Sequence, residues 1–144
     1  MKADKRAVTA DLDQFVRLHA SRLLGKLVFQ VKRASKHPDE DAIHDLRVAI
    51  RRLSQCLREF RPLFRRHRSA KILKQLEKVM DLAAETRNRD VALQLLRSDR
   101  RRSNRVLAAG LREEREQAQL NLTRALEDWR RRDFSRKWRP WLDR

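Results

Sequence analysis

The sequence predicts an all-α protein, an antiparallel bundle of about four long helices with a short C-terminal helix. Only two glycines and three prolines occur in 144 residues, whereas β-sheet proteins need such turn residues often. Charged and hydrophobic residues each make up 40% of the chain, which is the balance of amphipathic helices. Apolar residues also recur every three or four positions. The length suits one domain, residues 1–144.

The first helix is expected from about residue 12 to residue 34, where apolar residues follow helical spacing. Asp11 is a suitable N-cap for it, and Gly25 inside it suggests close packing. Pro38 ends the segment, because the residue before a proline is pushed out of the helical region.

The second helix is expected over about residues 39–60, and Pro62 closes it. Acidic residues at positions 39–41 favour its start through the helix dipole. One arc of this helix is apolar, formed by Leu46, Ile50, Leu53, Leu57 and Phe60. A second row, about a third of a turn or more away, contains His44, Arg47, Arg51, Gln55 and Arg58, with Arg52 beside it.

The third helix is expected over about residues 69–96, with a kink or a brief break at the polar stretch 85–89. The fourth helix begins near residue 103, where Ser103 or Asn104 is a candidate N-cap. Its predicted apolar face is formed by Val106, Leu107, Leu111, Ala118, Leu122, Ala125, Leu126 and Trp129. After an interruption at 130–133, a short amphipathic segment carries Trp138 and Trp141, expected in the core or an interface.

The basic row on the second helix predicts an anion site. The chain has 37 Lys and Arg against 20 Asp and Glu, a net charge of +17, which favours a polyanionic partner. Arg47 and Arg51 are like charges one turn apart, a pairing that costs roughly a few tenths of a kcal/mol. Asp45 and Glu59 are the only acids between residues 43 and 60, and neither is on the row. An ordinary solvated face would more often alternate charges.

The sequence contains no recognisable catalytic or metal-binding pattern. Nucleophile–base pairs, paired carboxylates and a glycine-rich phosphate loop are all missing. His44 has no ligand at metal-binding spacing, the other three histidines lie near other helix ends and Cys56 is alone, so neither a metal nor another cofactor is expected. No signal peptide and no apolar run of about 20 residues is found. We therefore expect a non-enzymatic cytoplasmic protein with no membrane association.

Three segments of the chain resemble the CHAD domain, the "conserved histidine α-helical domain". The segment HDLRVAIRRL at residues 44–53 matches the family signature, and RNRDV at 87–91 is similar to its Arg-Asp segment. A weaker match starts at residue 115. The resemblance implies an α-helical domain that binds inorganic polyphosphate through a basic surface or channel, without catalysis. It also implies association with polyphosphate granules.

Site residues follow from this resemblance and from helical geometry. The family motif carries over to His44, Arg47, Arg51 and Arg52, and the Arg-Asp pair to Arg89 and Asp90. Arg58 lies on the same helix face, and three lysines repeat the row on the third helix. The predicted polyphosphate-binding set is His44, Arg47, Arg51, Arg52, Arg58, Lys71, Lys74, Lys78 and Arg89.

The family usually has two similar helical halves, and this chain matches one of them. We therefore expect two chains to pair as a homodimer whose basic rows line a shared cavity. The alternative is a nucleic-acid-binding bundle. It is disfavoured because only Gln55 on the row could read base edges and the phenylalanines follow apolar faces. A third interpretation is a structural bundle whose basic face docks an acidic protein.

Overall fold

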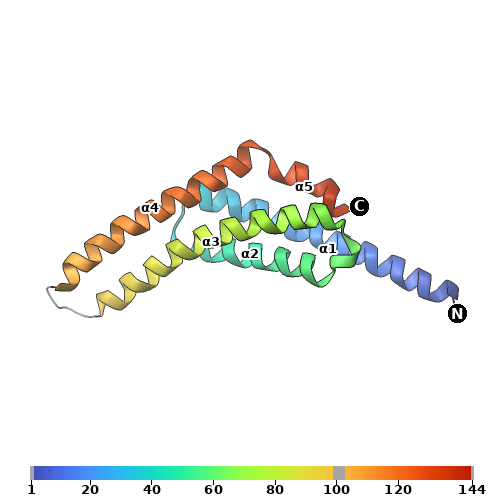
Figure 1. The fold of residues 1–144 in the computed structure, drawn as a ribbon, viewed down its shortest axis with the longest axis horizontal. Helices are drawn as coiled ribbons and strands as arrows, with labels where there is room; N and C mark the ends of the chain where they lie inside the picture. The colour runs from blue at the N-terminus through green and yellow to red at the C-terminus, as the bar shows by residue number, and fades with distance from the viewer. Residues whose placement is uncertain (1, 99–102, 144) are drawn as a thin grey trace.

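The computed structural model describes residues 2–98 and 103–143, and it confirms the all-α fold class. Its elements are α1 (Lys2–Lys36), α2 (Glu40–Glu59), a 3-10 turn η1 (Arg61–Leu63), α3 (Arg66–Arg97), α4 (Ser103–Arg131) and α5 (Phe134–Asp143). No strand occurs in these two ranges. The chain reverses direction between α1 and α2, between α2 and α3, and between α3 and α4 (Figure 1).

Both ends of α2 lie where the local sequence places them. The side chain of Asp39 caps the helix by accepting a hydrogen bond from the backbone N–H of Ala42 at 2.8 Å. Two acids follow in the first turn. At the other end, Phe60 donates its N–H to Cys56 before the turn that contains Pro62. The predicted boundaries of α2 are correct to one residue.

Other predicted boundaries are wrong. α1 begins at Lys2 rather than near residue 12, and Asp11 lies inside it instead of capping it. No proline or glycine interrupts residues 2–11, so nothing stops the helix from extending. α3 runs without a break through residues 85–89, because this polar stretch supplies contacts to neighbouring helices. Asn104 lies within α4 rather than before it.

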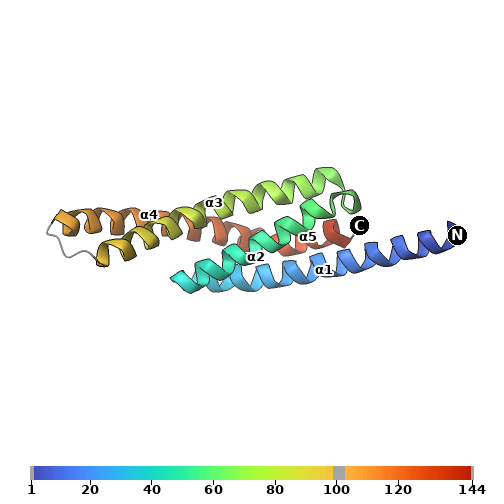
Figure 2. The same ribbon diagram turned by 90° about the horizontal axis from the view of Figure 1, so that it is seen from below.

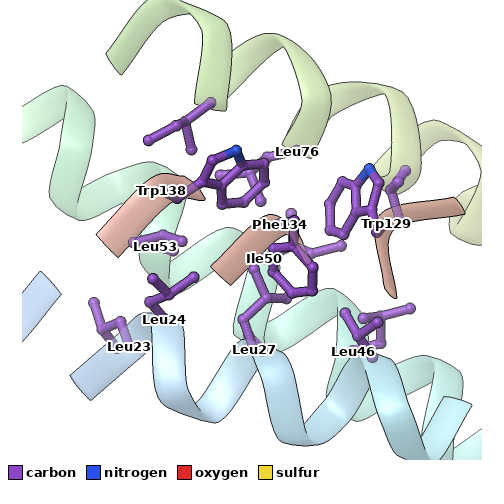
Figure 3. Packing of buried hydrophobic residues seen from close by; sticks show 14 of the residues in the cluster. Leu23, Leu24, Leu27, Leu46, Ile50, Leu53, Leu76, Trp129, Phe134 and Trp138 are labelled. Carbon is purple, nitrogen blue, oxygen red and sulfur yellow. The ribbon is translucent and has the colours of Figure 1, made fainter. Parts of the chain in front are cut away.

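The hydrophobic core lies among α1, α2 and α3 and is closed by α5 with the end of α4. Side chains from all five helices meet there, among them Leu24, Leu27, Leu46, Ile50, Leu53, Leu76, Trp129, Phe134 and Trp138 (Figure 3). The ring centroid of Trp138 is 5.3 Å from that of Trp129 and 5.1 Å from that of Phe134, at steep angles. Trp129 and Trp138 are buried and Trp141 is partly buried, so the tryptophans belong to the core as predicted.

Two parts of the molecule extend beyond this core. The distal halves of α3 and α4 project past the connection between α1 and α2, and the first turns of α1 project past α5 (Figures 1 and 2). Large apolar residues are exposed there, namely Leu12, Phe15, Leu95, Val106 and Leu107. Val106 and Leu107 had been predicted on the apolar face of the fourth helix, so that part of the prediction is wrong. Gly25 is exposed too, and a Cβ there would meet nothing within 4 Å. The predicted close packing at this glycine is wrong.

Candidate anion-binding surface on the first two helices

A groove runs along the outer faces of α1 and α2 where these helices pack together. Its cavity of about 880 Å³ is lined by basic side chains from both helices: His19, Arg22 and Lys26 from α1, and His44 and Arg52 from α2. A second cavity of about 370 Å³ shares His19, Lys26 and Arg52 and continues toward Phe60. The two cavities form one elongated depression, which suits a linear ligand.

The charge of this groove is almost uncompensated. Asp45 is the acid of the larger cavity, and it already accepts a hydrogen bond from the guanidinium of Arg33. Within residues 2–98 and 103–143, none of the five basic side chains forms an ion pair. Glu59 lies at the far end, in the smaller cavity. The groove therefore carries a positive potential over most of its length.

The opposite flank of α2 holds a second basic cluster, formed by Arg47, Arg51 and Arg87. Partial burial lowers the pKa of Arg47, and the positive charges of Arg51 and Arg87 lower it further. Its Nε atom is buried without a hydrogen-bond partner in the part of the chain that the structure describes. Arg87 forms an ion pair with Glu40, with 2.7 Å between Nη1 of the arginine and Oε1 of the glutamate. A bound anion would give Arg47 the partner that it lacks.

The structure divides the predicted row on α2 between these two surfaces. His44 and Arg52 line the groove toward α1, whereas Arg47 lies beside Arg51 and within electrostatic reach of Arg87 of α3. Arg58 is exposed in the last turn of α2. The predicted residues of α2 therefore lie on one wall of the groove and in the neighbouring cluster, except for Arg58.

The predicted cations of α3 are not brought beside those of α2. Lys78 lines a separate cavity between α3 and the α4–α5 corner, together with Asp128 and Trp138. Lys71 lies two turns earlier on the same helix face as Lys78, and Lys74 is exposed as well. The side chain of Arg89 reaches α4, where its Nε atom lies 3.4 Å from Oε2 of Glu114.

The Arg-Asp segment of α3 has a structural partner in α4. Asp90 is buried at 9% exposure, and it accepts a hydrogen bond from Arg115. Arg115 also donates a hydrogen bond to Oε1 of Gln119 at 2.6 Å. Arg89 and Asp90 therefore contact different residues of α4. Their ion pairs join the two helices, which explains why this polar stretch lies in a continuous helix.

The basic residues of α1 were missed by the sequence prediction. His19, Arg22 and Lys26 are spaced by three and four residues, so they lie on one face of α1. A signal was present in the sequence, because residues 14–38 contain no Asp or Glu. This run without acidic residues is overlooked when only the spacing of apolar residues is considered.

Other chemistry on the described residues is limited. No group of three or more His, Cys, Asp or Glu side chains with metal-binding geometry occurs among them. Cys56 is a buried free thiol, and burial, with a smaller effect of Glu59, raises its pKa. Over residues 2–98 and 103–143, no helix is both long and apolar enough to cross a membrane.

Comparisons with known proteins identify the family of this chain. No curated protein and no solved structure matches it. A family model described as "CHAD domain" matches residues 16–144. This match covers nearly the whole chain, including all of α2 through α5 and the basic groove. The chain therefore belongs to the CHAD domain family.

Proposed function

We propose that this protein binds inorganic polyphosphate, without transforming it, in the basic groove between α1 and α2. CHAD domains are linked to polyphosphate binding in general. The observation that carries the proposal here is the charge balance of the groove. Five basic side chains line the larger cavity, and its acid, Asp45, is already paired with Arg33.

The shape of the groove supports a chain-like ligand. His19 and Lys26 are seven residues apart, which is about 10 Å along the helix axis, and the depression continues past Arg52 toward the end of α2. Polyphosphate offers a negative charge at every phosphate and no other group to recognise. Regularly spaced cations along one channel suit such a ligand, and arginine can contact phosphate oxygens in pairs.

The cluster around Arg47 offers a second contact on the far side of α2. Arg47 carries the energetic cost of partial burial beside two other cations. A polyanion that reached this cluster would reduce the repulsion and satisfy the Nε atom. Pairing of two chains and a cytoplasmic location, which the sequence suggested, stay predictions.

Competition binding with matched variants tests the proposal. The groove variant Arg22→Ala/Lys26→Ala/Arg52→Ala and the control variant Lys71→Ala/Lys74→Ala/Lys78→Ala each remove three positive charges. We expect the groove variant to lose labelled long-chain polyphosphate affinity by roughly tenfold or more, because counterion release depends on the contacts removed. The slope of log affinity against log salt should fall by roughly two in magnitude. Equal losses in the two variants would show that net charge, rather than the groove, holds the ligand.

A further inference from the structure

The outer face of α1 exposes aromatic rings that the sequence had assigned to apolar faces. The side chains of Phe15 and Phe29 are 65% and 64% exposed. Exposed single hydrophobic residues are common, but two phenylalanines this accessible on one helix are a specific feature of this surface. The sequence argued against nucleic-acid binding because its phenylalanines followed apolar faces. The structure removes that objection.

The two rings lie at the ends of a single ridge that also contains the cations of the groove. Phe15, His19, Arg22, Lys26 and Phe29 are spaced by four, three, four and three residues, so they line one face of α1. The ridge is roughly 21 Å long at 1.5 Å per residue. The rings of Phe15 and His19 are stacked, with 6.4 Å between centroids and an interplanar angle of 4°. Flat aromatic surfaces thus flank a central positive patch.

The proximity of the ridge to the groove places aromatic and phosphate-binding groups together. Phe29 lines the same cavity as Arg22, Lys26 and Arg52. Polyphosphate would use the cations of this surface but would have no use for the rings. A single-stranded nucleic acid would use both, because its backbone is a polyanion and every base offers a flat face for stacking. A duplex would not, since its bases are already stacked on each other.

We propose that the ridge of α1 and the adjoining groove bind single-stranded nucleic acid. Bases stack on the Phe15–His19 pair and on Phe29, while Arg22, Lys26 and Arg52 hold the phosphates. This inference rests on the proposed anion-binding role of the groove and adds a preference for polyanions that carry bases. Charge complementarity supports it, because no acid occurs in residues 14–38 and Asp45 is paired.

The distribution of charge along the ridge favours nucleic acid over a lipid surface. A helix that lies in a membrane interface separates an apolar face from a charged face. On the ridge, His19, Arg22 and Lys26 lie between the two phenylalanines. If both phenylalanine rings were inserted into the acyl region of a membrane, the cations between them would be buried there too, which is unfavourable. Stacking on bases has no such cost, since phosphates accompany the bases.

The test compares three ligands of similar charge: a short deoxythymidine oligomer, an abasic oligomer of the same length and polyphosphate. The variant Phe15→Leu/Phe29→Leu keeps apolar side chains and removes the aromatic faces, and both positions are exposed, so the fold is retained. We expect the wild type to bind the thymidine oligomer more tightly than the abasic one. The double variant should weaken thymidine binding by roughly tenfold and leave binding of the other two ligands unchanged. The control Leu12→Ala/Leu18→Ala, on the same helix, should bind all three as the wild type does.

The outcomes separate this inference from the proposed function. Equal binding of both oligomers, with no effect of the phenylalanine substitutions, would overturn the stacking role while polyphosphate binding stood. Loss of binding to anionic phospholipid vesicles in the double variant, with thymidine binding intact, would assign the ridge to a membrane surface instead. Failure of the wild type to bind any of the three polyanions would overturn both proposals.

Discussion

Two helix pairs of this protein, α1–α2 and α3–α4, are both rich in arginine, but they use it differently. Between α3 and α4, Arg89 lies against Glu114 and Arg115 binds Asp90, so the positive charges hold the helices together. Among the described residues, the ion pair that joins α1 to α2 is Arg33–Asp45. His19, Arg22 and Lys26 of α1 and His44 and Arg52 of α2 line the groove without such partners within residues 2–98 and 103–143. The density of arginine is therefore a poor guide to an anion site unless the opposing carboxylates are counted.

The two pairs also differ in how completely they bury apolar side chains. Every large apolar side chain on the core face of α2 is buried, including Leu46, Leu53 and Leu57 at 0% exposure. The distal part of the α3–α4 pair exposes Leu95 and Val106 at 69% and 79%. Most of the hydrophobic stabilisation therefore comes from the end of the molecule where α1, α2, α3 and α5 meet. The α3–α4 extension depends more on its ion pairs.

The largest expected effect tests this difference in burial. Leu53→Ala should lower the free energy of unfolding by about 3 kcal/mol, because it removes a fully buried side chain and leaves a cavity. Leu95→Ala, at an exposed position of α3, should change it by less than about 0.5 kcal/mol. Urea denaturation followed by circular dichroism measures both. Similar losses would mean that the α3–α4 extension is packed against something that this single chain does not supply.

The second prediction concerns the ion pairs of the extension. Arg115→Met should cost about 2 kcal/mol, because it leaves the buried carboxylate of Asp90, whose Oδ2 already lacks a partner among the described residues, without its guanidinium. Amide hydrogen exchange should accelerate in α3 and α4 and stay unchanged in α2. The exposed Arg112→Met serves as the control. Faster exchange throughout the chain would show that the extension does not open independently.

The smallest expected effect lies on α2 itself. Arg47→Met should raise the free energy of unfolding by about 0.5 kcal/mol in the absence of ligand, because it removes a partly buried charge and relieves the repulsion from Arg51 and Arg87. The same change should weaken polyphosphate binding. Arg58→Met, in the exposed last turn, should leave stability unaltered. A loss of stability in Arg47→Met would mean that its aliphatic stem, rather than its charge, dominates at this position.

The sequence predicted α2 well because its signals are local. The cap at Asp39, the closing Pro62 and a regular apolar arc are all read within one segment. The start of α1 was missed because its first turns contain no apolar core residue to reveal the period and no residue that breaks a helix. The break expected at 85–89 was wrong because the partners of this stretch, including Glu40 and Glu114, lie far away in the sequence.

The candidate site was predicted in part for the same reason. His44 and Arg52 were identified from a motif on one helix, and the structure places them in the groove. The other wall comes from α1, and only the packing of α1 on α2 brings Arg22 and Lys26 opposite them. The lysine row of α3 has the same spacing as the row of α2, but Lys78 faces the α4–α5 corner. Spacing along a helix defines a face, and tertiary structure decides what that face meets.

The projecting start of α1 has a consequence for how this protein can change over time. The family match begins at Val16, which is also the first buried side chain from residue 4 onward. No side chain in residues 4–15 is buried, so substitutions there do not disturb the core. Phe15, at the end of the ridge, belongs to this segment. Selection can therefore alter one end of the proposed ligand surface at little cost in folding, and ligand preference can diverge between descendants that keep the same bundle.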